Sequence, residues 1–528
     1  MSEKLLKILE DVGSKLDNPP ANKDSLIRLL KQAAASLSEL EQSPGKEVSK
    51  SMQPFVNAIV KPQLLKHHDK EVKLLVAACT CEITRVTAPE APYDDDVLKD
   101  VFHLIVSTFS GLRDTKGPSY GRRVTILETV AKYKSCVVML DLECDDLINE
   151  MFTTFFAVAS DGHPETVITS MKTIMVVLLE ESEDINQDLL LIILRVLGRN
   201  KKGITMAARK LAMSVIRQCA GKLEPGIKHV IVKSMSGEAS SSASFHIDHH
   251  EIIYDIYRCA PQALAGIIPY LSGELMIDKL DVRLKAVKLA GDLFSIPGYS
   301  IPDTFHPIFI DFLKRLTDKV VEVRMSVLEH VKLCLLSNPS RSESPQFVAA
   351  LCDRLLDYDE SIRQKVVAVV SDIACYDLSS ISPNTIKLVA DRLRDKSLLV
   401  KKYTMERLSD IYRISCHKHM SDVYNWIPGQ LLRCFYDKDF RSDMVEYILC
   451  TSLFPVEFSV KDKVRTWVRL FSKFDNVEKK ALEKILEQKQ RLQLEVRKYL
   501  SLRKMSKESD ALEVKKKVMI CLRYMSHC

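Results

Sequence analysis

The chain has 528 residues, of which 46% are apolar, and a formal net charge of +6. This length exceeds what one compact core usually accommodates, so we expect several domains or an elongated array. Only 16 residues are glycine, which disfavours sheet-rich folds and glycine-dependent phosphate loops and favours helices.

Cysteine usage and missing motifs narrow the class of protein further. The 14 cysteines are spread singly apart from Cys79 and Cys81, and no Cys-x-x-Cys pair occurs, which argues against zinc ribbons and fingers. Free thiols at apolar helix positions indicate a reducing compartment, the cytosol or the nucleus. Because no nucleotide-binding, zinc-protease or hydrolase motif is present, we predict a binding protein and not an enzyme.

Residues 1–265 are predicted to form irregular helical repeats. Apolar residues recur at helical spacing from the start of the chain, as in Leu5, Leu9, Val12 and Leu16. Clusters of Pro, Gly, Asp and Ser separate the helical segments. The N-terminus carries no signal-peptide pattern, and no apolar run approaches the ~20 residues of a membrane span.

A proline-rich loop interrupts this first region. Pro89 and Pro92 lie three residues apart between small alanines, and Tyr93 follows them. Prolines restrict the backbone to extended conformations, so a rigid and exposed loop of this kind is suited to docking a peptide. From physical considerations alone, a simple connector between two helices is the favoured interpretation.

Histidines follow a serine-rich stretch near residue 240. On a helix His246, His249 and His250 would share one face, as metal ligands do, which leaves a metal hydrolase as one alternative. The segment leads directly into an apolar helix, however, and we favour a polar helix start without a metal.

Residues 266–415 contain the clearest repeats. Four aligned segments carry an aliphatic residue followed by a basic one at Arg283, Arg324, Arg363 and Lys401, with spacings of 41, 39 and 38 residues. Asp318, Asp357 and Asp395 each stand six residues before the last three of these, and Asp278 stands five before the first. Helical hairpins with this approximate period are typical of HEAT repeats, so we predict an all-α HEAT/armadillo-like helical-repeat solenoid. We expect each basic residue to reach the aspartate of the preceding unit.

Other basic residues accompany the repeats. Lysines and arginines on successive helices can converge on one polyanion. The alternative is that they belong to the structural Asp–Arg pairs, and Arg363 is assigned to those pairs. The set consists of Arg363, Lys365, Arg394, Lys396, Lys401 and Lys402.

Residues 416–528 form a C-terminal helical segment with a basic tail. From position 461 onward there are 19 Lys and Arg against 9 Asp and Glu, which suits an acidic partner or a nucleic-acid backbone, although a solvated helix face is the simpler interpretation. Residues 476–504 are predicted to be long helices. No polar cap closes the array, so we expect a truncated or short form. The predicted buried stripe is Leu482, Ile485, Leu486, Leu492, Val496 and Leu500.

Several segments together resemble a known family. These are residues 88–93, 114–118, 127–131, 161–163, 426–428, 431–432, 443–446 and 454–455, in that order along nearly the whole chain. They are similar to the cohesin regulator family named precocious dissociation of sisters protein five, in its plant-type form. The family's proteins are considerably longer, so the chain resembles their N-terminal half.

The resemblance implies a nuclear HEAT-repeat cohesin cofactor. Such a protein regulates sister chromatid cohesion in mitosis by binding the cohesin kleisin subunit and the releasing and protecting factors. It also has a role in DNA repair by homologous recombination. It associates with chromatin mainly through cohesin and not with a membrane. An unrelated HEAT adaptor, serving nuclear transport or scaffolding a phosphatase, is the alternative.

The resemblance also implies binding residues. The loop would dock short motifs of the releasing and protecting factors, and a later stretch would hold the kleisin. No cofactor is required, but some members bind inositol hexakisphosphate among the repeats. The docking residues are Ala88, Pro89, Glu90, Ala91, Pro92 and Tyr93; the kleisin residues are Tyr436, Asp443, Glu446 and Phe454; the inositol-phosphate residues are Lys365, Arg394, Lys401 and Lys402.

Overall fold

The computed structural model describes residues 2–43, 45–199, 201–236, 248–298, 300–418, 421–440, 442–508 and 512–527. These residues form helices and turns and contain no β-strand, which confirms the predicted all-α fold. The chain divides into two compact units, Met1–Leu271 and Ser272–Cys528. The predicted divisions after residues 265 and 415 rest on sequence character and remain predictions.

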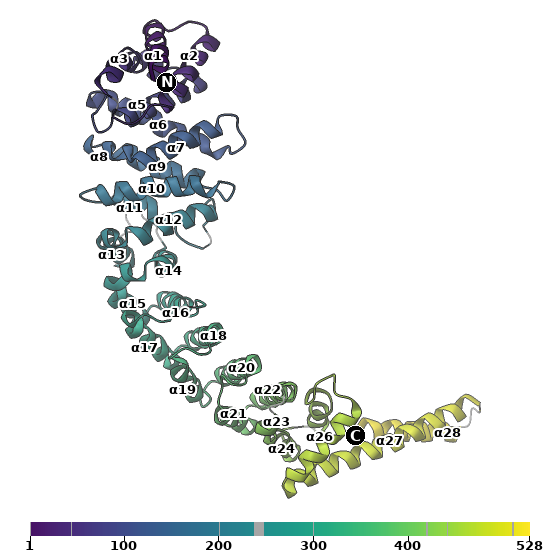
Figure 1. Cartoon of the computed structure of the whole chain (residues 1–528). Helices are drawn as coiled ribbons and strands as arrows, with labels where there is room; N and C mark the ends of the chain where they lie inside the picture. Colours follow the sequence, from purple (N-terminus) through teal and green to yellow (C-terminus); the bar gives the residue numbers. More distant parts are fainter. Residues whose placement is uncertain are drawn as a thin grey trace. The chain divides into compact units, whose positions relative to one another are not determined.

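The first unit is built from two rows of helices (Figure 1). In one row α2, α5, α7, α10, α12 and α14 each pack on the next, and in the other α6, α9, α11 and α13 do the same. Short 3-10 segments, among them η1 (Ser110–Arg113), η2 (Ser135–Val137) and η5 (Pro261–Ile267), join some of them. The helices are α1 (Ser2–Asp17), α2 (Lys23–Ser38), α3 (Lys46–Ile59), α4 (Pro62–Leu65), α5 (Lys70–Thr87), α6 (Asp95–Phe109), α7 (Tyr120–Tyr133), α8 (Val138–Asp141), α9 (Asp145–Val158), α10 (Glu165–Glu181), α11 (Gln187–Leu194), α12 (Met206–Gln218), α13 (Ala220–Ser236) and α14 (His249–Cys259).

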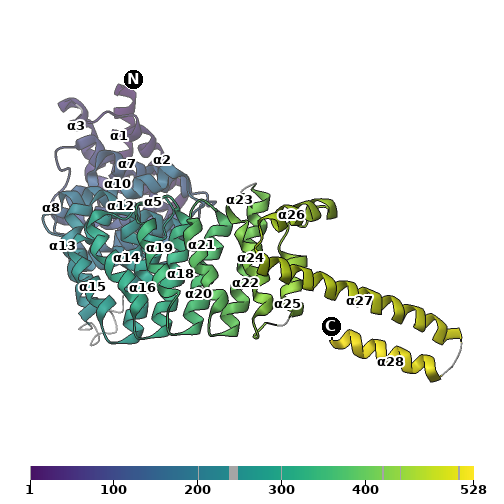
Figure 2. The same cartoon turned by 90° about the horizontal axis from the view of Figure 1, so that it is seen from below.

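The second unit repeats this arrangement. Figure 2 shows α16, α18, α20, α22 and α24 side by side, and each packs on the next. The helices are α15 (Ile268–Met276), in which the division between the units falls, α16 (Leu280–Phe294), α17 (His306–Lys314), α18 (Val321–Ser337), α19 (Ser344–Arg354), α20 (Glu360–Tyr376), α21 (Pro383–Ala390), α22 (Leu398–His417), α23 (Ser421–Tyr424), α24 (Trp426–Arg433), α25 (Ser442–Tyr447), α26 (Val460–Lys473), α27 (Asn476–Glu508) and α28 (Leu512–His527). Its short segments are η6 (Asp303–Phe305), η7 (Arg315–Thr317), η8 (Asp391–Arg394), η9 (Cys434–Tyr436) and the π-helical η10 (Ile448–Ser452).

Apolar burial between the helices explains why the hairpins stack. In the first unit the rings of Phe109 and Phe155 lie 5.3 Å apart and are fully buried. In the second, Phe309 makes edge-on contacts with Phe294 at 5.8 Å and with Phe347 at 5.2 Å. A single hairpin cannot cover such a face, so each unit is stabilised by the contact of one hairpin with its neighbour.

Buried ion pairs fix the register of the second unit. Arg283 contacts Asp318 at 2.9 Å, Arg324 contacts Asp357 at 3.1 Å, and Arg363 contacts Asp395 at 2.8 Å. We call these three pairs, together with Lys401 and its partners described below, the Arg–Asp ladder. The predicted pairing of a basic residue with an aspartate in each repeat is confirmed. The predicted direction of the pairing is wrong, because each arginine reaches the aspartate of the following unit and not that of the preceding one.

The local geometry gives the reason for this direction. Arg324 donates to the main-chain oxygen of Asp318 at 2.7 Å, and Arg363 donates to that of Asp357 at 2.8 Å. Each guanidinium therefore satisfies a carbonyl at the start of its own helix and directs its remaining donors toward the next repeat. Asp278 is not part of the ladder, since it is 95% exposed and pairs only with Lys319 at the surface.

The C-terminal helices differ from the prediction. Ile485 of α27 is buried, but Leu486, Val496 and Leu500 are exposed. Half of the predicted stripe therefore has no cover among the described residues, and Leu482 and Leu492 are half-buried. Within the described residues, no helix is long and apolar enough to cross a membrane.

Candidate partner-binding surfaces

The loop at 88–93 lies between α5 and α6 in the first unit (Figure 1). The Ser43 hydroxyl donates to the carbonyl of Ala88 at 2.6 Å, and the Tyr93 hydroxyl donates to the carbonyl of Val56 at 3.2 Å. Burial raises the pKa of Tyr93 well above its ordinary value. Both ends of the loop are thus held in place, while Pro89, Glu90 and Ala91 are exposed.

This geometry separates the six predicted docking residues into two groups. The exposed tip presents two small apolar side chains beside a carboxylate, which is the kind of surface a short peptide can cover. Tyr93 instead fastens the loop to α3, so its hydroxyl is already occupied. The structure therefore supports a rigid edge at residues 89–91 and gives the aromatic residue a positioning role.

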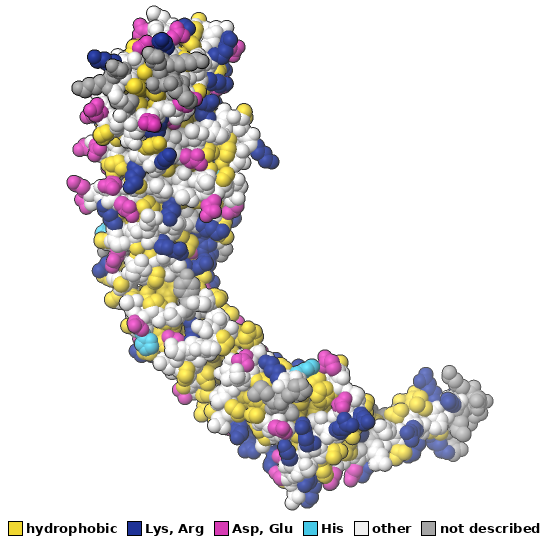
Figure 3. All heavy atoms as spheres, viewed as in Figure 1, with side chains coloured by type: hydrophobic (Ala, Val, Ile, Leu, Met, Phe, Trp, Pro, Cys, Tyr) yellow, Lys and Arg dark blue, Asp and Glu magenta, His cyan; other side chains and the backbone are white. Residues whose placement is uncertain are grey.

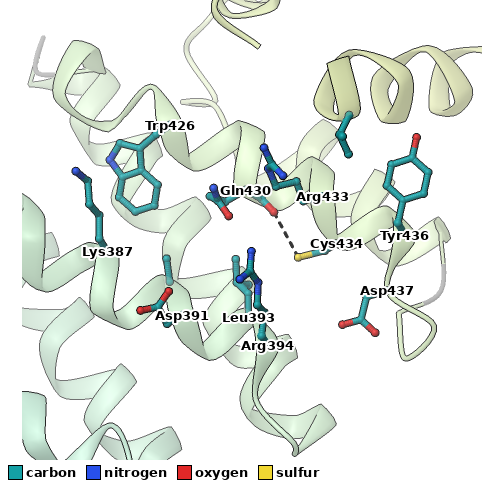
Figure 4. A pocket seen from close by; sticks show the side chains of 12 residues that line it. Lys387, Asp391, Leu393, Arg394, Trp426, Gln430, Arg433, Cys434, Tyr436 and Asp437 are labelled. Atoms are coloured by element: carbon teal, nitrogen blue, oxygen red, sulfur yellow. Dashed lines mark hydrogen bonds between the residues drawn. The ribbon is translucent and has the colours of Figure 1, made fainter. Parts of the chain in front are cut away.

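A hollow of about 660 Å³ opens in the second unit, and we call it the Trp426 hollow. Figure 4 shows its side chains, which come from α21, η8, α24, η9 and the start of α27. Both polar and apolar side chains line it, as on many protein-recognition surfaces. The lining residues are Lys387, Ala390, Asp391, Leu393, Arg394, Trp426, Gln430, Arg433, Cys434, Tyr436, Asp437 and Val477.

Three donors on side chains that line the Trp426 hollow have no acceptor among the described residues. The indole N–H of Trp426 is buried and has no acceptor among the described residues. Lys387 and Arg394 are exposed on the same hollow. Arg433, by contrast, is held by Glu478 at 2.9 Å and by Asp475, and these hydrogen bonds raise its pKa. These groups could donate hydrogen bonds to carbonyl or carboxylate oxygens of a ligand that lies beside the aromatic ring.

The four predicted kleisin residues occupy different environments. Tyr436 is exposed on the Trp426 hollow, with the Lys484 ammonium 5.3 Å from its ring centre. Asp443 is exposed on α25, and Glu446 pairs with Lys489 at 3.0 Å.

Phe454 does not fit a direct contact with a partner. Its ring is buried and packs against Tyr412 at 6.1 Å and Trp467 at 5.6 Å. The sequence could not show that Phe454 is buried, because a phenylalanine in the core and a phenylalanine that contacts a partner have the same sequence pattern. Phe454 therefore belongs to the core between α22 and α26.

The four predicted inositol-phosphate residues do not form a ready site. Lys401 is buried and contacts Asp437 at 2.8 Å and Asp439 at 2.7 Å, so it is the fourth cation of the Arg–Asp ladder. Lys365 pairs with Glu329. A polyanion would have to displace these carboxylates, and of the four residues only Arg394 lines the Trp426 hollow. Lys402 is half-buried on α22. The four residues therefore do not line one common hollow, and inositol hexakisphosphate binding stays a prediction.

The histidine segment lies partly outside the described residues, since His246 is not among them. Asp248 caps α14 by accepting the N–H of His250, and the Nδ1 of His249 lies 3.1 Å from the Ser234 hydroxyl. The polar start of α14 is therefore confirmed, while the absence of a metal stays a prediction.

Sequence reasoning missed Lys387, Trp426, Gln430 and Arg433 as members of one surface. They come from α21 and α24, which are neighbours across the repeat and not along the chain. The available signal was Trp426, because a tryptophan directly at a helix start in a polar context is unusual for a core residue. The repeat period, applied from α21 to α24, would have placed Lys387 beside it.

Comparison with known proteins gives a consistent result. The family model described as sister chromatid cohesion protein PDS5 protein matches residues 24–528. The chain is 60% identical over 531 aligned residues to "Sister chromatid cohesion protein PDS5 homolog A" of Arabidopsis thaliana, covering 100% of this chain and 33% of that protein. It is 27% identical to "Sister chromatid cohesion protein PDS5 homolog B" of Homo sapiens, covering 98% of this chain and 36% of that protein. The chain thus spans about a third of the length of these relatives.

A solved structure supports the fold. The structure described as "Structure of the Pds5-Scc1 complex and implications for cohesin function" aligns with a TM-score of 0.72 at 19% identity, covering 95% of this chain and 78% of that chain. At this identity the likeness concerns architecture alone. It confirms the predicted HEAT-repeat solenoid.

Proposed function

The chain belongs to the sister chromatid cohesion protein PDS5 family, as a plant-type member, and from this we propose that it is a non-catalytic scaffold that regulates cohesion by binding cohesin components. Family membership and the related structure, which is described as a Pds5–Scc1 complex, support the kleisin subunit as its partner. A role in the nucleus during mitosis, and in DNA repair by homologous recombination, follows from the same family resemblance.

We place kleisin binding at the Trp426 hollow and the adjoining face of α25. The observation that carries this placement is the buried indole N–H of Trp426, which lacks an acceptor beside the exposed cations Lys387 and Arg394. Such a surface can bind the main chain of an extended segment and one carboxylate. Aromatic and arginine side chains in a hollow are also the residue types that dominate binding energy in protein interfaces.

We place the releasing and protecting factors at the tip of the loop, residues 89–91. The support is its exposure combined with the hydrogen bonds at both ends, made through Ser43 and Tyr93. A loop that is already ordered loses little conformational entropy when a peptide binds. The two proposed sites lie in different units, so they can be tested separately.

The test of the kleisin site is a titration of a labelled kleisin fragment with Tyr436→Ala combined with Arg394→Glu. Both residues are exposed on the hollow, so folding should be preserved. We expect the dissociation constant to rise roughly 10- to 100-fold, the range found when interface hot spots are removed. Glu446→Lys is a poorer probe, because it would place a second cation against Lys489.

A matched control uses Lys285→Glu with Lys288→Glu, two exposed lysines on α16. Unchanged kleisin affinity in Tyr436→Ala/Arg394→Glu would contradict the placement. If the wild-type chain retained an import cargo or a phosphatase subunit in a pull-down while the kleisin fragment passed through, the adaptor alternative would replace the cohesin proposal.

A further inference from the structure

A row of exposed valines runs along α26 and the turn before it. Val456, Val460, Val464 and Val468 are spaced four residues apart and are 87%, 80%, 55% and 66% exposed. Within α26 this spacing places Val460, Val464 and Val468 on one face of the helix, and Val456 lies in the turn before it. We call these four residues the valine row.

The side of α26 that adjoins the valine row is the side that packs. Leu470 is buried, and Trp467 contacts Phe454 at 5.6 Å and Phe474 at 6.4 Å. The helix therefore has one apolar face in the protein core and a second one in solvent. Figure 2 shows α26 extending outward beside the start of α27.

A row of basic residues accompanies the valines. Lys461, Arg465 and Arg469 follow Val460, Val464 and Val468 by one position each, so the basic row runs parallel to the valine row. Val460, Lys461, Val464, Arg465 and Val468 line one hollow of about 620 Å³. In Figure 3, hydrophobic and basic side chains both reach the surface over the C-terminal helices.

Two members of this row, Lys461 and Arg465, make few polar contacts within the described residues. Arg465 reaches Asp462 at 3.6 Å, an exposed pair within one helix that contributes little. Scattered exposed apolar residues need no explanation, but a continuous apolar row bordered by charge is typical of an interaction site. The valine row requires an apolar stripe on the partner, and the basic row requires a line of carboxylates beside that stripe.

We propose that the valine row and the basic row together bind an acidic amphipathic helix of another protein. Valine side chains four residues apart form a ridge, and side chains of a second helix fit into the groove beside it. The partner's apolar residues would recur at helical spacing, as in other helix-in-groove complexes. Its Asp and Glu residues would face Lys461 and Arg465.

The same features argue against other occupants. If a second copy of this chain bound through the same face, the two basic rows would lie against each other and repel. Nucleic acid gains little from a ridge made mainly of aliphatic side chains, since Trp467 packs against Phe454 and Phe471 stands at one end of the ridge. A membrane surface is met by rows of large protruding side chains such as Trp, Phe or Leu. The exposed apolar side chains of α26 are instead three short valines and one phenylalanine, Phe471.

The experiment uses the full chain and a synthetic peptide of about 18 residues, long enough to form a helix, with leucines at helical spacing and glutamates elsewhere. A peptide of equal composition but shuffled order is the control. We expect fluorescence anisotropy to detect binding of the first peptide and at least tenfold weaker binding of the second. Added salt should weaken the complex.

Two variants of the chain test the two rows. Val464→Glu with Val468→Glu should abolish binding without changing the melting temperature, because both side chains are exposed. Lys461→Glu with Arg465→Glu should reject the glutamate peptide and instead bind one in which lysine replaces glutamate. Lys285→Glu with Lys288→Glu, on α16, should leave affinity for the glutamate peptide unchanged.

Four results would overturn the proposal. They are no binding of the leucine–glutamate peptide, equal binding of the shuffled peptide, self-association of the chain that Val464→Glu abolishes, and binding to phosphatidylcholine–phosphatidylserine vesicles that depends on Val464. None of these tests changes Tyr436, Arg394 or the loop. The outcome is therefore independent of the kleisin and docking proposals.

Discussion

At the scale of single residues, Arg324 is the side chain whose loss should cost the second unit most. It is 1% exposed, contacts the buried Asp357 at 3.1 Å, and lies over the ring of Tyr358 at 4.6 Å. Arg324→Ala leaves the buried Asp357 carboxylate with Arg354 alone, at 3.3 Å, so we expect the loss to lie toward the lower end of the about 3–5 kcal/mol that breaking a buried pair costs. We expect urea unfolding followed by circular dichroism to show this loss.

The control for Arg324 is an exposed pair of the same type. Lys319 contacts Asp278 at 3.2 Å, but both side chains lie in solvent. Lys319→Ala should change the free energy of unfolding by less than about 1 kcal/mol. Equal effects of the two substitutions would show that burial does not determine the importance of a ladder pair.

Asp395 gives the ladder a dependence on pH. Burial alone would raise the pKa of Asp395, but the hydrogen bonds and charge of Arg363 outweigh it and hold the pKa below the ordinary value of 3.8. A carboxyl whose pKa is lower in the folded state stabilises the fold above the unfolded pKa and loses that contribution as pH falls through the folded pKa. Stability should therefore decline below about pH 4, and Asp395→Asn should be less stable at neutral pH with a flatter decline.

The measurement for Asp395 is the melting temperature between neutral and acidic pH. Asp278→Asn, at an exposed carboxylate outside the ladder, serves as the control and should follow the wild type. Parallel acid profiles for wild type and Asp395→Asn would mean that other carboxylates determine the acid response.

Residue identity was enough to predict the pairs but not their direction. The recurrence of Asp and Arg near a period of forty residues shows that the two types belong together in each repeat. Whether Arg324 turns to Asp318 or to Asp357 depends on which carbonyls its other donors meet, and this is a matter of side-chain geometry. Lys401 illustrates the same limit, since its sequence context suggested a polyanion site and its burial against Asp437 assigns it to the ladder.

At the scale of elements, the loop between α5 and α6 combines an exposed tip with fixed ends. Pro89→Ser with Pro92→Ser would free the backbone and increase the entropy that a binding peptide must remove. We expect affinity for releasing-factor peptides to fall roughly 3- to 10-fold, the equivalent of about 1 kcal/mol. Helix content should remain unchanged.

A more conservative change isolates the support of this loop. Tyr93→Phe removes only the hydroxyl that donates to Val56 and should weaken peptide binding less than the proline substitutions. Isothermal titration calorimetry with the same peptide compares the three proteins. Full peptide affinity in the double proline variant would argue that the peptide binds elsewhere.

In the C-terminal helices, periodicity predicted which residues share a helix face, but it did not predict which of these residues are buried. Leu482, Ile485 and Leu486 were expected to be buried together, yet only Ile485 is. A repeated spacing shows which residues share a face, but burial requires a second surface to cover that face. The valine row on α26 shows the same limit, because its residues share one face and no described helix covers that face.

At the scale of the whole molecule, a stack of hairpins should respond to damage locally. In repeat proteins each unit contacts only its neighbours, so stability is approximately a sum of repeat and interface contributions. In Arg324→Ala, amides of α18 and α20 should exchange with deuterium roughly 100-fold faster, the equivalent of about 3 kcal/mol. Amides of α5 and α7, which lie in the other unit, should keep their wild-type protection. Hydrogen exchange followed by mass spectrometry resolves these segments, and Lys319→Ala provides the baseline. Equal acceleration in α5 and α18 would mean that the chain unfolds as one cooperative body, and the nearest-neighbour description would then fail for this array.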